Sequence, residues 1–227
     1  MITTNAHDKV RHFNKLGLHY NLVADAVYKA RESLGDPLSI DYMPYITAGL
    51  VSFDMSRMMG IDAKSRYDRE AGGFATLLEK KIEAIRPLIS HLVNSRLDML
   101  DIQSEKDNIK TAYVILSSAG KDGLNRRGDN IHFHVGATKI LHFINPYAYI
   151  IIDSNASRAF NKFHNIDLRN YAPQGYSAEK YIECMECAKR DILNYGVEDF
   201  IAIEKGTPIA RIYDKLTFVT GSKNLQD

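Results

Sequence analysis

The amino-acid sequence predicts an all-α protein, a compact multi-helix domain of about nine helices. Apolar residues recur at three- and four-residue intervals through most of the chain, which is the period of an amphipathic helix. Glycine and proline follow several of these stretches, as at Gly35-Asp36-Pro37, where a helix is expected to end. Residues 147–152 are extended and apolar but too short to define a sheet.

Two long helices are predicted near the start of the chain. The first covers 13–34 and is expected to pack in the core, with a dimer seam as the alternative. Its apolar stripe consists of Phe13, Leu16, Tyr20, Val23, Val27, Ala30 and Leu34. The second covers 42–59, is nearly apolar throughout, and predicts a central buried helix that ends at Gly60. It carries Asp54 and Arg57 at i, i+3, a spacing typical of an ion pair.

The middle of the chain predicts two further helical regions and a basic loop. A helix over 74–85 is expected to break or kink at Pro87, after which a second segment runs to about Leu100. A short helix over 107–119 leads into a glycine-rich loop, residues 120–130, which contains Arg126 and Arg127.

A helix is predicted from about 131 to 144, ended by Asn145-Pro146. Its apolar face lies opposite a polar face that is formed by His134, Thr138, His142 and Asn145, with Lys139 at the edge. Lys139 at this position can be a solvated surface lysine or a residue of a functional site. The next helix begins at about Ser154, so that Asp153 occupies the N-cap position.

The C-terminal part predicts one long apolar stripe from Tyr181 to Tyr195, closed by Gly196, and a last helix. Thr207-Pro208 is expected to supply the N-cap and the first turn of that last helix. Cys184 and Cys187 form a CxxC pair inside the stripe. Because no second pair exists and no strand precedes it, we expect a packed Cys184 and no metal or redox site.

Composition limits the function. Hydrophobic residues make up 45% and charged residues 25% of the 227 positions, and the net charge is +1. No apolar run approaches the length of a membrane span, and the first residues lack a signal-peptide core, so a cytoplasmic protein is expected. The near-neutral charge is unlike that of most nucleic-acid binders, although a local basic patch is sufficient. We expect one helical domain over 1–227, with lobes at about 1–105 and 106–227 as the alternative.

Residues 107–165 resemble the core of the helix-hairpin-helix DNA glycosylases. The resemblance consists of a helix, a short hairpin around His134-Val135-Gly136, a second helix, and an extended segment that ends in Asp153. In this superfamily, backbone N–H groups of the hairpin hold a DNA phosphate. The resemblance therefore implies DNA contacts by residues of the loop and hairpin. These are Arg126, Arg127, His134, Gly136 and Thr138.

The same resemblance implies a catalytic carboxylate, Asp153, and a candidate nucleophile, Lys139. Cleavage of an N-glycosidic bond builds positive charge on the sugar, which a fixed carboxylate stabilises. A lysine amine with a lowered pKa can attack the sugar and form a Schiff base. Lys139 lies three residues after Gly136, where lyase-type members place their lysine two residues after, the position of Thr138. The optional iron–sulfur cluster of the family needs four cysteines, so no cofactor is expected.

The implied substrate is double-stranded DNA with one damaged or deliberately modified base flipped out, in repair or in defence against modified phage DNA. The candidate residues of the base pocket are Tyr42, Tyr45, Tyr149, Asp54 and Arg57.

Three alternatives stay open. Asp153 can be a helix cap alone. The chain can be a non-catalytic helix-hairpin-helix DNA-binding protein, or a helical interaction protein that dimerises through 13–34. It is expected to be a monomer or a homodimer.

Overall fold

The computed structural model describes residues 1–52, 73–118, 133–168 and 177–222. Within these ranges it contains ten α-helices and no strand, which confirms the all-α class. The helices are α1 (Ala6–Leu16), α2 (Leu18–Leu34), α3 (Met43–Ser52), α4 (Gly73–Ile89), α5 (Lys106–Ser117), α6 (His134–Ile144), α7 (Ser154–His164), α8 (Ala178–Tyr195), α9 (Val197–Ala202) and α10 (Ile209–Gly221). Asp54, Arg57, Arg126 and Arg127 lie outside the described residues.

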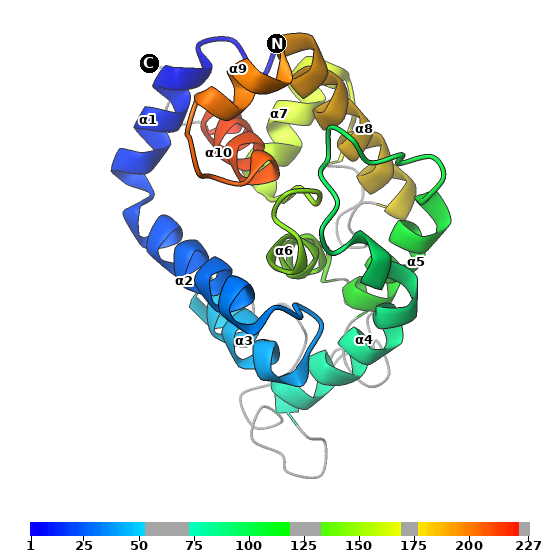
Figure 1. The fold of residues 1–227 in the computed structure, drawn as a ribbon. Helices are drawn as coiled ribbons and strands as arrows, with labels where there is room; N and C mark the ends of the chain where they lie inside the picture. The colour runs from blue at the N-terminus through cyan, green and yellow to red at the C-terminus, as the bar shows by residue number, and fades with distance from the viewer. Residues whose placement is uncertain (53–72, 119–132, 169–176, 223–227) are drawn as a thin grey trace, which may run out of the picture.

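Helix α6 lies at the centre of the fold, and the other helices surround it (Figure 1). All of its residues from 136 to 144 are buried. The sequence prediction assigned this central place to 42–59, and for the described part of that stretch, α3, the prediction was wrong; residues 53–59 and the predicted end at Gly60 lie outside the described residues. Helix α3 begins at Met43 and exposes Tyr45 and Val51 on its outer side.

Three of the four residues of the predicted polar face of α6, Thr138, His142 and Asn145, are also buried, and each has a partner inside the protein. Thr138 and Asn145 bond to main-chain groups, and His142 bonds to a carbonyl and to a tyrosine hydroxyl. Buried polar groups are tolerated when such partners are present. The face therefore joins α6 to its neighbours.

The helix predicted over 13–34 is two helices. Gly17 ends α1 and precedes α2, and a side-chain carbon at this position would lie 2.9 Å from both the ring and the carbonyl oxygen of Phe13. The change of direction splits the predicted stripe. Phe13 and Val27 are buried, whereas Leu16 is 62% exposed.

Helix α4 continues through Pro87, which lies in its last turn. The expected second helix up to Leu100 does not form. Residues 90–92 make a short 3-10 helix, η4 (Ser90–Leu92), and turns follow. Their main chain bonds to the segment after α6: the Asn145 amide donates to the carbonyls of Leu92 and Ser95. These contacts replace the helical hydrogen bonds that the apolar pattern suggested.

The later helices agree more closely with the sequence. Helix α5 lies within one or two residues of its prediction, and α7 begins at Ser154. Helix α8 carries a buried Cys184 and ends at Gly196, whose φ is +93°. Helix α10 starts one residue later than expected, with Pro208 at the N-cap and no side-chain cap from Thr207. Helix α9 was not predicted.

Helices α7 and α10 pack with their main chains in close approach. A side-chain carbon on Gly221 would lie 1.8 Å from the carbonyl oxygen of Asn155. A single cluster of buried apolar side chains includes members of all ten α-helices. None of the helices in the described ranges is long and apolar enough to cross a membrane.

Candidate active site

Asp153 lies at the N-terminus of α7, where it is both a helix cap and part of a cavity wall. Its Oδ1 accepts hydrogen bonds of 2.8 Å from the main-chain N–H groups of Asn155 and Ala156. The preceding residue is fixed from α6, since the N–H of Ile152 donates to Oγ1 of Thr138 over 3.2 Å. The carboxylate is therefore held from both sides along the chain.

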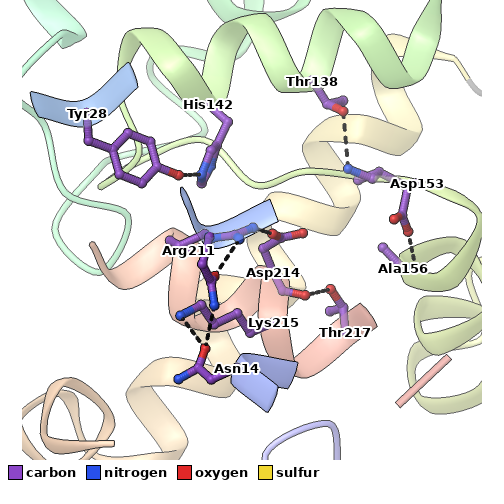
Figure 2. A network of polar contacts seen from close by, with 12 residues as sticks. Asn14, Tyr28, Thr138, His142, Asp153, Ala156, Arg211, Asp214, Lys215 and Thr217 are labelled. Carbon is purple, nitrogen blue, oxygen red and sulfur yellow. Dashed lines mark hydrogen bonds and ion pairs between the residues drawn. The ribbon is translucent and has the colours of Figure 1, made fainter. Parts of the chain in front are cut away.

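Lys139 follows Thr138 on α6 and lines the same cavity as Asp153. Two charged residues of α10, Arg211 and Asp214, complete the polar part of the wall and form an ion pair. Figure 2 shows these two side chains pointing toward each other on α10, with Thr138 and Asp153 on the segments that face them. The cavity thus gathers two cations and two carboxylates from three helices.

Burial shifts the pKa values of Lys139, Asp153 and Asp214 toward their neutral forms. Burial lowers the pKa of Lys139, against the opposing charges of Asp153 and Asp214. Burial also raises the pKa of Asp153, with the charge of Asp214 adding to the shift and the cap hydrogen bonds and Lys139 opposing it. The pKa of Asp214 is raised by burial as well, against Arg211. A lysine and a carboxylate with shifted pKa values in one cavity can supply a nucleophilic amine and a proton carrier.

The cavity is small and is rimmed by aromatic rings. Its volume is about 30 Å³, close to the share of one water in the liquid. Ligand pockets usually measure about 300–1,000 Å³. Phe13, Tyr20 and Phe218 line it, and Tyr20 is 41% exposed, so the cavity meets solvent beside this ring. A ligand larger than water needs a shift of these aromatic side chains.

A polar network supports α10 from the N-terminal helices. Arg211 donates to Asn21 over 3.1 Å, and Asn21 in turn donates to Asn14 over 3.0 Å. Lys215 donates to Asn14 over 2.9 Å and forms an ion pair of 2.6 Å with Glu204. The network fixes the guanidinium of Arg211 at the junction of α1 and α2, which is where Gly17 divides the two helices.

A second hydrogen-bonded chain reaches the cavity from α2. Tyr28 lines the cavity, and its Oη lies 2.6 Å from Nε2 of His142. The Nδ1 of His142 lies 2.6 Å from the carbonyl oxygen of Tyr149. The pair joins α2, α6 and the extended segment that leads to Asp153.

Lys139 and Asp153 were both predicted from the sequence, and the structure brings them together. The residues that were expected to contact DNA from a hairpin are helical in the structure. His134, Gly136 and Thr138 belong to the first turns of α6 and do not form a hairpin. Thr138 is fully buried, and its hydroxyl donates to the Val135 carbonyl while accepting from Ile152, so it has no solvent-facing role.

Gly136 is buried against Phe133, whose ring would lie 1.8 Å from a side-chain carbon at this position. The glycine therefore allows close packing at the start of α6. His134 is partly exposed, and its Nδ1 lies 2.6 Å from the hydroxyl of Tyr113. Its imidazole stacks on that tyrosine ring, with centroids 5.9 Å apart.

The tyrosines expected in the base pocket do not line the cavity among the residues that the structure describes. Tyr42 is fully buried, and its hydroxyl donates to the carbonyl of Phe143 over 2.9 Å. Tyr45 is 46% exposed and stacks on Tyr42. Tyr149 is fully buried, with its carbonyl bonded to His142. The pattern identified aromatic residues but could not show which of them face the cavity.

Sequence reasoning missed Arg211, Asp214 and Tyr28. A signal existed in the stretch RIYDKL, residues 211–216, where every side chain is buried. Three charged residues, Arg211, Asp214 and Lys215, lie there among three apolar ones. Charges interspersed in an inward-facing helix mark a buried polar site, since buried charges need partners.

Metal and disulfide chemistry find no support in the described part of the chain. No group of three or more His, Cys, Asp and Glu residues is arranged there to hold a metal ion. Cys184 and Cys187 are buried free thiols within α8.

Comparison with known proteins gives no relative: no family model, no curated protein and no solved structure matches this chain.

Proposed function

We propose that this protein is a DNA N-glycosylase that removes a damaged or modified base from duplex DNA. The observation that carries the proposal is the convergence of Lys139 and Asp153 on one cavity. The resemblance to helix-hairpin-helix glycosylases named these two residues as the candidate nucleophile and the candidate carboxylate. Their side chains come from different helices, and burial shifts both pKa values toward the neutral forms.

Asp153 supplies the carboxylate that faces the developing charge on the sugar. As the bond from C1′ to the base breaks, its electron pair leaves with the base and positive charge grows on the sugar ring. Two cap hydrogen bonds hold Oδ1 in place before the reaction begins. A carboxylate fixed in this way stabilises the transition state without reorganisation.

Lys139 supplies the nucleophile in the bifunctional form of the reaction. Its Nζ attacks C1′ as the base departs, the bond from C1′ to O4′ then breaks, and the two hydrogens of the amine pass to the base and to O4′, which leaves a Schiff base between Nζ and C1′. This step requires an uncharged amine, and burial of Lys139 lowers its pKa in that direction. In the monofunctional form, water attacks C1′ and passes its proton to Asp153, and Lys139 contacts the DNA.

Base entry requires the cavity to open. Its volume of about 30 Å³ fits a water molecule and not a base. The aromatic rings of Phe13, Tyr20 and Phe218 lie where a flipped base would stack. Flipping costs roughly a few kcal/mol, least for a damaged or mismatched base.

The proposed DNA surface includes Arg126 and Arg127, which precede α6 in the sequence and lie outside the described residues. Replacing both by alanine should weaken binding about equally across sequences and reduce the slope of log affinity against log salt. Unchanged binding and salt slope would leave the two arginines as solvated loop residues. A total lack of salt-dependent DNA retention would favour the helical interaction protein instead.

The small cavity supports a second candidate, a DNA-binding protein without catalytic activity. One experiment separates the two. The protein is incubated with native and modified duplexes in the presence of borohydride, and free base, abasic sites and covalent adducts are measured. The catalytic proposal expects base release that Asp153→Asn loses, and any adduct should map to Lys139 by peptide mass spectrometry. Lys81, another buried lysine with a lowered pKa, lies outside the cavity wall; it is the matched control and should carry no adduct.

A further inference from the structure

The protonation of His142 follows from its two contacts. Its Nδ1 lies 2.6 Å from the carbonyl oxygen of Tyr149, and a carbonyl only accepts, so Nδ1 must carry a hydrogen. Burial lowers the pKa of His142 to about 3, against the hydrogen bond to Tyr149 and with help from the nearby charges of Arg211 and Lys139. The ring is therefore neutral at physiological pH, and Nε2 carries a lone pair.

The hydroxyl of Tyr28 is fixed by this arrangement. Its Oη lies 2.6 Å from Nε2 of His142, and because Nε2 has no proton, Tyr28 must be the donor. Burial also raises the pKa of Tyr28, so the hydroxyl keeps its proton at neutral pH. The one proton of Tyr28 is committed to His142, and only acceptor lone pairs remain for other groups.

Tyr28 is a wall residue of the cavity. It lines the same wall as Lys139 and Asp153, and the charges of Arg211 and Asp214 both act on its hydroxyl. The same wall also contains the carboxyl groups of Asp153 and Asp214 and the donor groups of Lys139 and Arg211. A ligand group that carries hydrogen on nitrogen can pair with the hydroxyl of Tyr28. An oxo or methyl group there would supply no donor to the lone pairs of that oxygen.

We infer that Tyr28 is a specificity-determining residue, locked by His142 as a hydrogen-bond acceptor, which selects ligands with an N–H or amino group at this position. The identity of the ligand as a nucleobase rests on the proposed function. The assignment of the Tyr28 hydroxyl as a hydrogen-bond acceptor toward the ligand does not. An amino-substituted base would be preferred to its oxo or methyl counterpart. Loss of the partner of one buried polar group corresponds to about 5- to 150-fold in affinity.

The orientation of the hydrogen bonds is tested without any substrate. Protein labelled with ¹⁵N at histidine is studied by multiple-bond ¹H–¹⁵N correlation, which reports the tautomer of each ring. The Nδ1–H tautomer of His142 is expected from pH 8 down to pH 5, and Tyr28→Phe should shift only its Nε2 resonance. An Nε2–H ring or a doubly protonated ring would overturn the inference, because Tyr28 could then donate to the cavity.

Selection is tested with free bases in matched pairs. Adenine is compared with 6-methylpurine, and 2-aminopurine with 2-methylpurine, by NMR titration of the wild-type protein and of Tyr28→Phe. In one pair at least, wild-type protein should favour the amino base by about 5- to 150-fold. The ratio of the two affinities should fall toward 1 in the Tyr28→Phe variant. Equal binding of both members, a preference that survives in Tyr28→Phe, or binding of no probe would each overturn it.

The two proposals fail in different experiments. If the tautomer and the amino preference are found but no duplex releases a base, the proposed glycosylase activity is lost and the assignment of Tyr28 stands. If base release is found but Tyr28→Phe retains the full amino preference, the assignment of Tyr28 is lost and the proposed glycosylase activity stands.

Discussion

Replacing Asp153 by asparagine separates the two functions of this residue. Both cap hydrogen bonds that the structure shows, to the N–H groups of Asn155 and Ala156, end on the same oxygen, Oδ1. The Oδ1 of asparagine can accept both bonds, and the amide nitrogen replaces the second carboxylate oxygen. Asparagine caps helices about as well as aspartate does. The substitution therefore keeps the cap and removes the negative charge from the cavity.

The stability of the variant can be predicted with its sign. Burial raises the folded-state pKa of Asp153, so the folded state binds its proton more tightly than the unfolded chain does. Ionisation of Asp153 thus lowers the stability of the protein as the pH rises past the ordinary pKa of an aspartate. Asp153→Asn removes that penalty at neutral pH, and the melting temperature should be unchanged or slightly higher.

The rate of base release should fall in the same variant. Loss of one well-aimed electrostatic group commonly costs about 10² to 10³ in rate. We expect Asp153→Asn to fold and to bind DNA like the wild-type protein, while release of the base falls by that factor. The assay is single-turnover base release on an active duplex, together with thermal unfolding and equilibrium DNA binding.

Two controls make the result decisive. Asp153→Ala removes the cap as well as the charge and should also lose about 1 kcal/mol of stability. Ser177 is another N-cap, whose side chain accepts from the N–H of Lys180 on α8, outside the cavity wall. Ser177→Ala should lose similar stability and keep full activity. Base release at the wild-type rate by Asp153→Asn would reduce Asp153 to a helix cap and refute the mechanism.

Three further changes have predicted outcomes. Thr138→Val should lower the free energy of unfolding by about 1–3 kcal/mol, because the N–H of Ile152 loses its acceptor, whereas Thr138→Ser should not. Gly221→Ala should shift the melting temperature down strongly, since its side chain would lie 1.8 Å from a carbonyl of α7, and wild-type stability would contradict that packing. The hydrogen bond to Asp191 raises the pKa of His164 to about 9, so its stabilisation should be complete below pH 6.5 and lost as the pH rises through 9. Urea unfolding of wild-type protein and His164→Gln across this range should converge at high pH.

Local signals predicted the helices whose ends are set locally. Helix α7 begins where Asp153 provides a cap, and α8 ends where Gly196 takes a positive φ. The same reasoning failed at Gly17, because the apolar period continues through the residue at which the chain turns. The spacing of apolar residues does not reveal a change in chain direction when the helices on both sides of it have an apolar face.

Two of the four charged residues of the cavity were predictable, and the reason is chemical. Asp153 and Lys139 stand out in the sequence by their place beside a helix start and on a polar helix face. Arg211 and Asp214 become part of the site only because α10 packs against α7 at Gly221. Tyr28 requires the packing of α2 on α6. Contacts between segments so distant in sequence depend on the whole fold.

The charges of the cavity give a last test of the link between Asp153 and Lys139. The carboxylate of Asp153 raises the pKa of Lys139 against burial, so its removal in Asp153→Asn should lower that pKa further. Lys139 should then react with acetic anhydride at lower pH than in the wild-type protein, as measured by competitive labelling and peptide mass spectrometry. Lys81, which bonds to the carbonyls of Ile115 and Ser118, should keep its profile. An unchanged pKa of Lys139, or an upward shift, would show that the two groups are not coupled, which contradicts their convergence on one cavity.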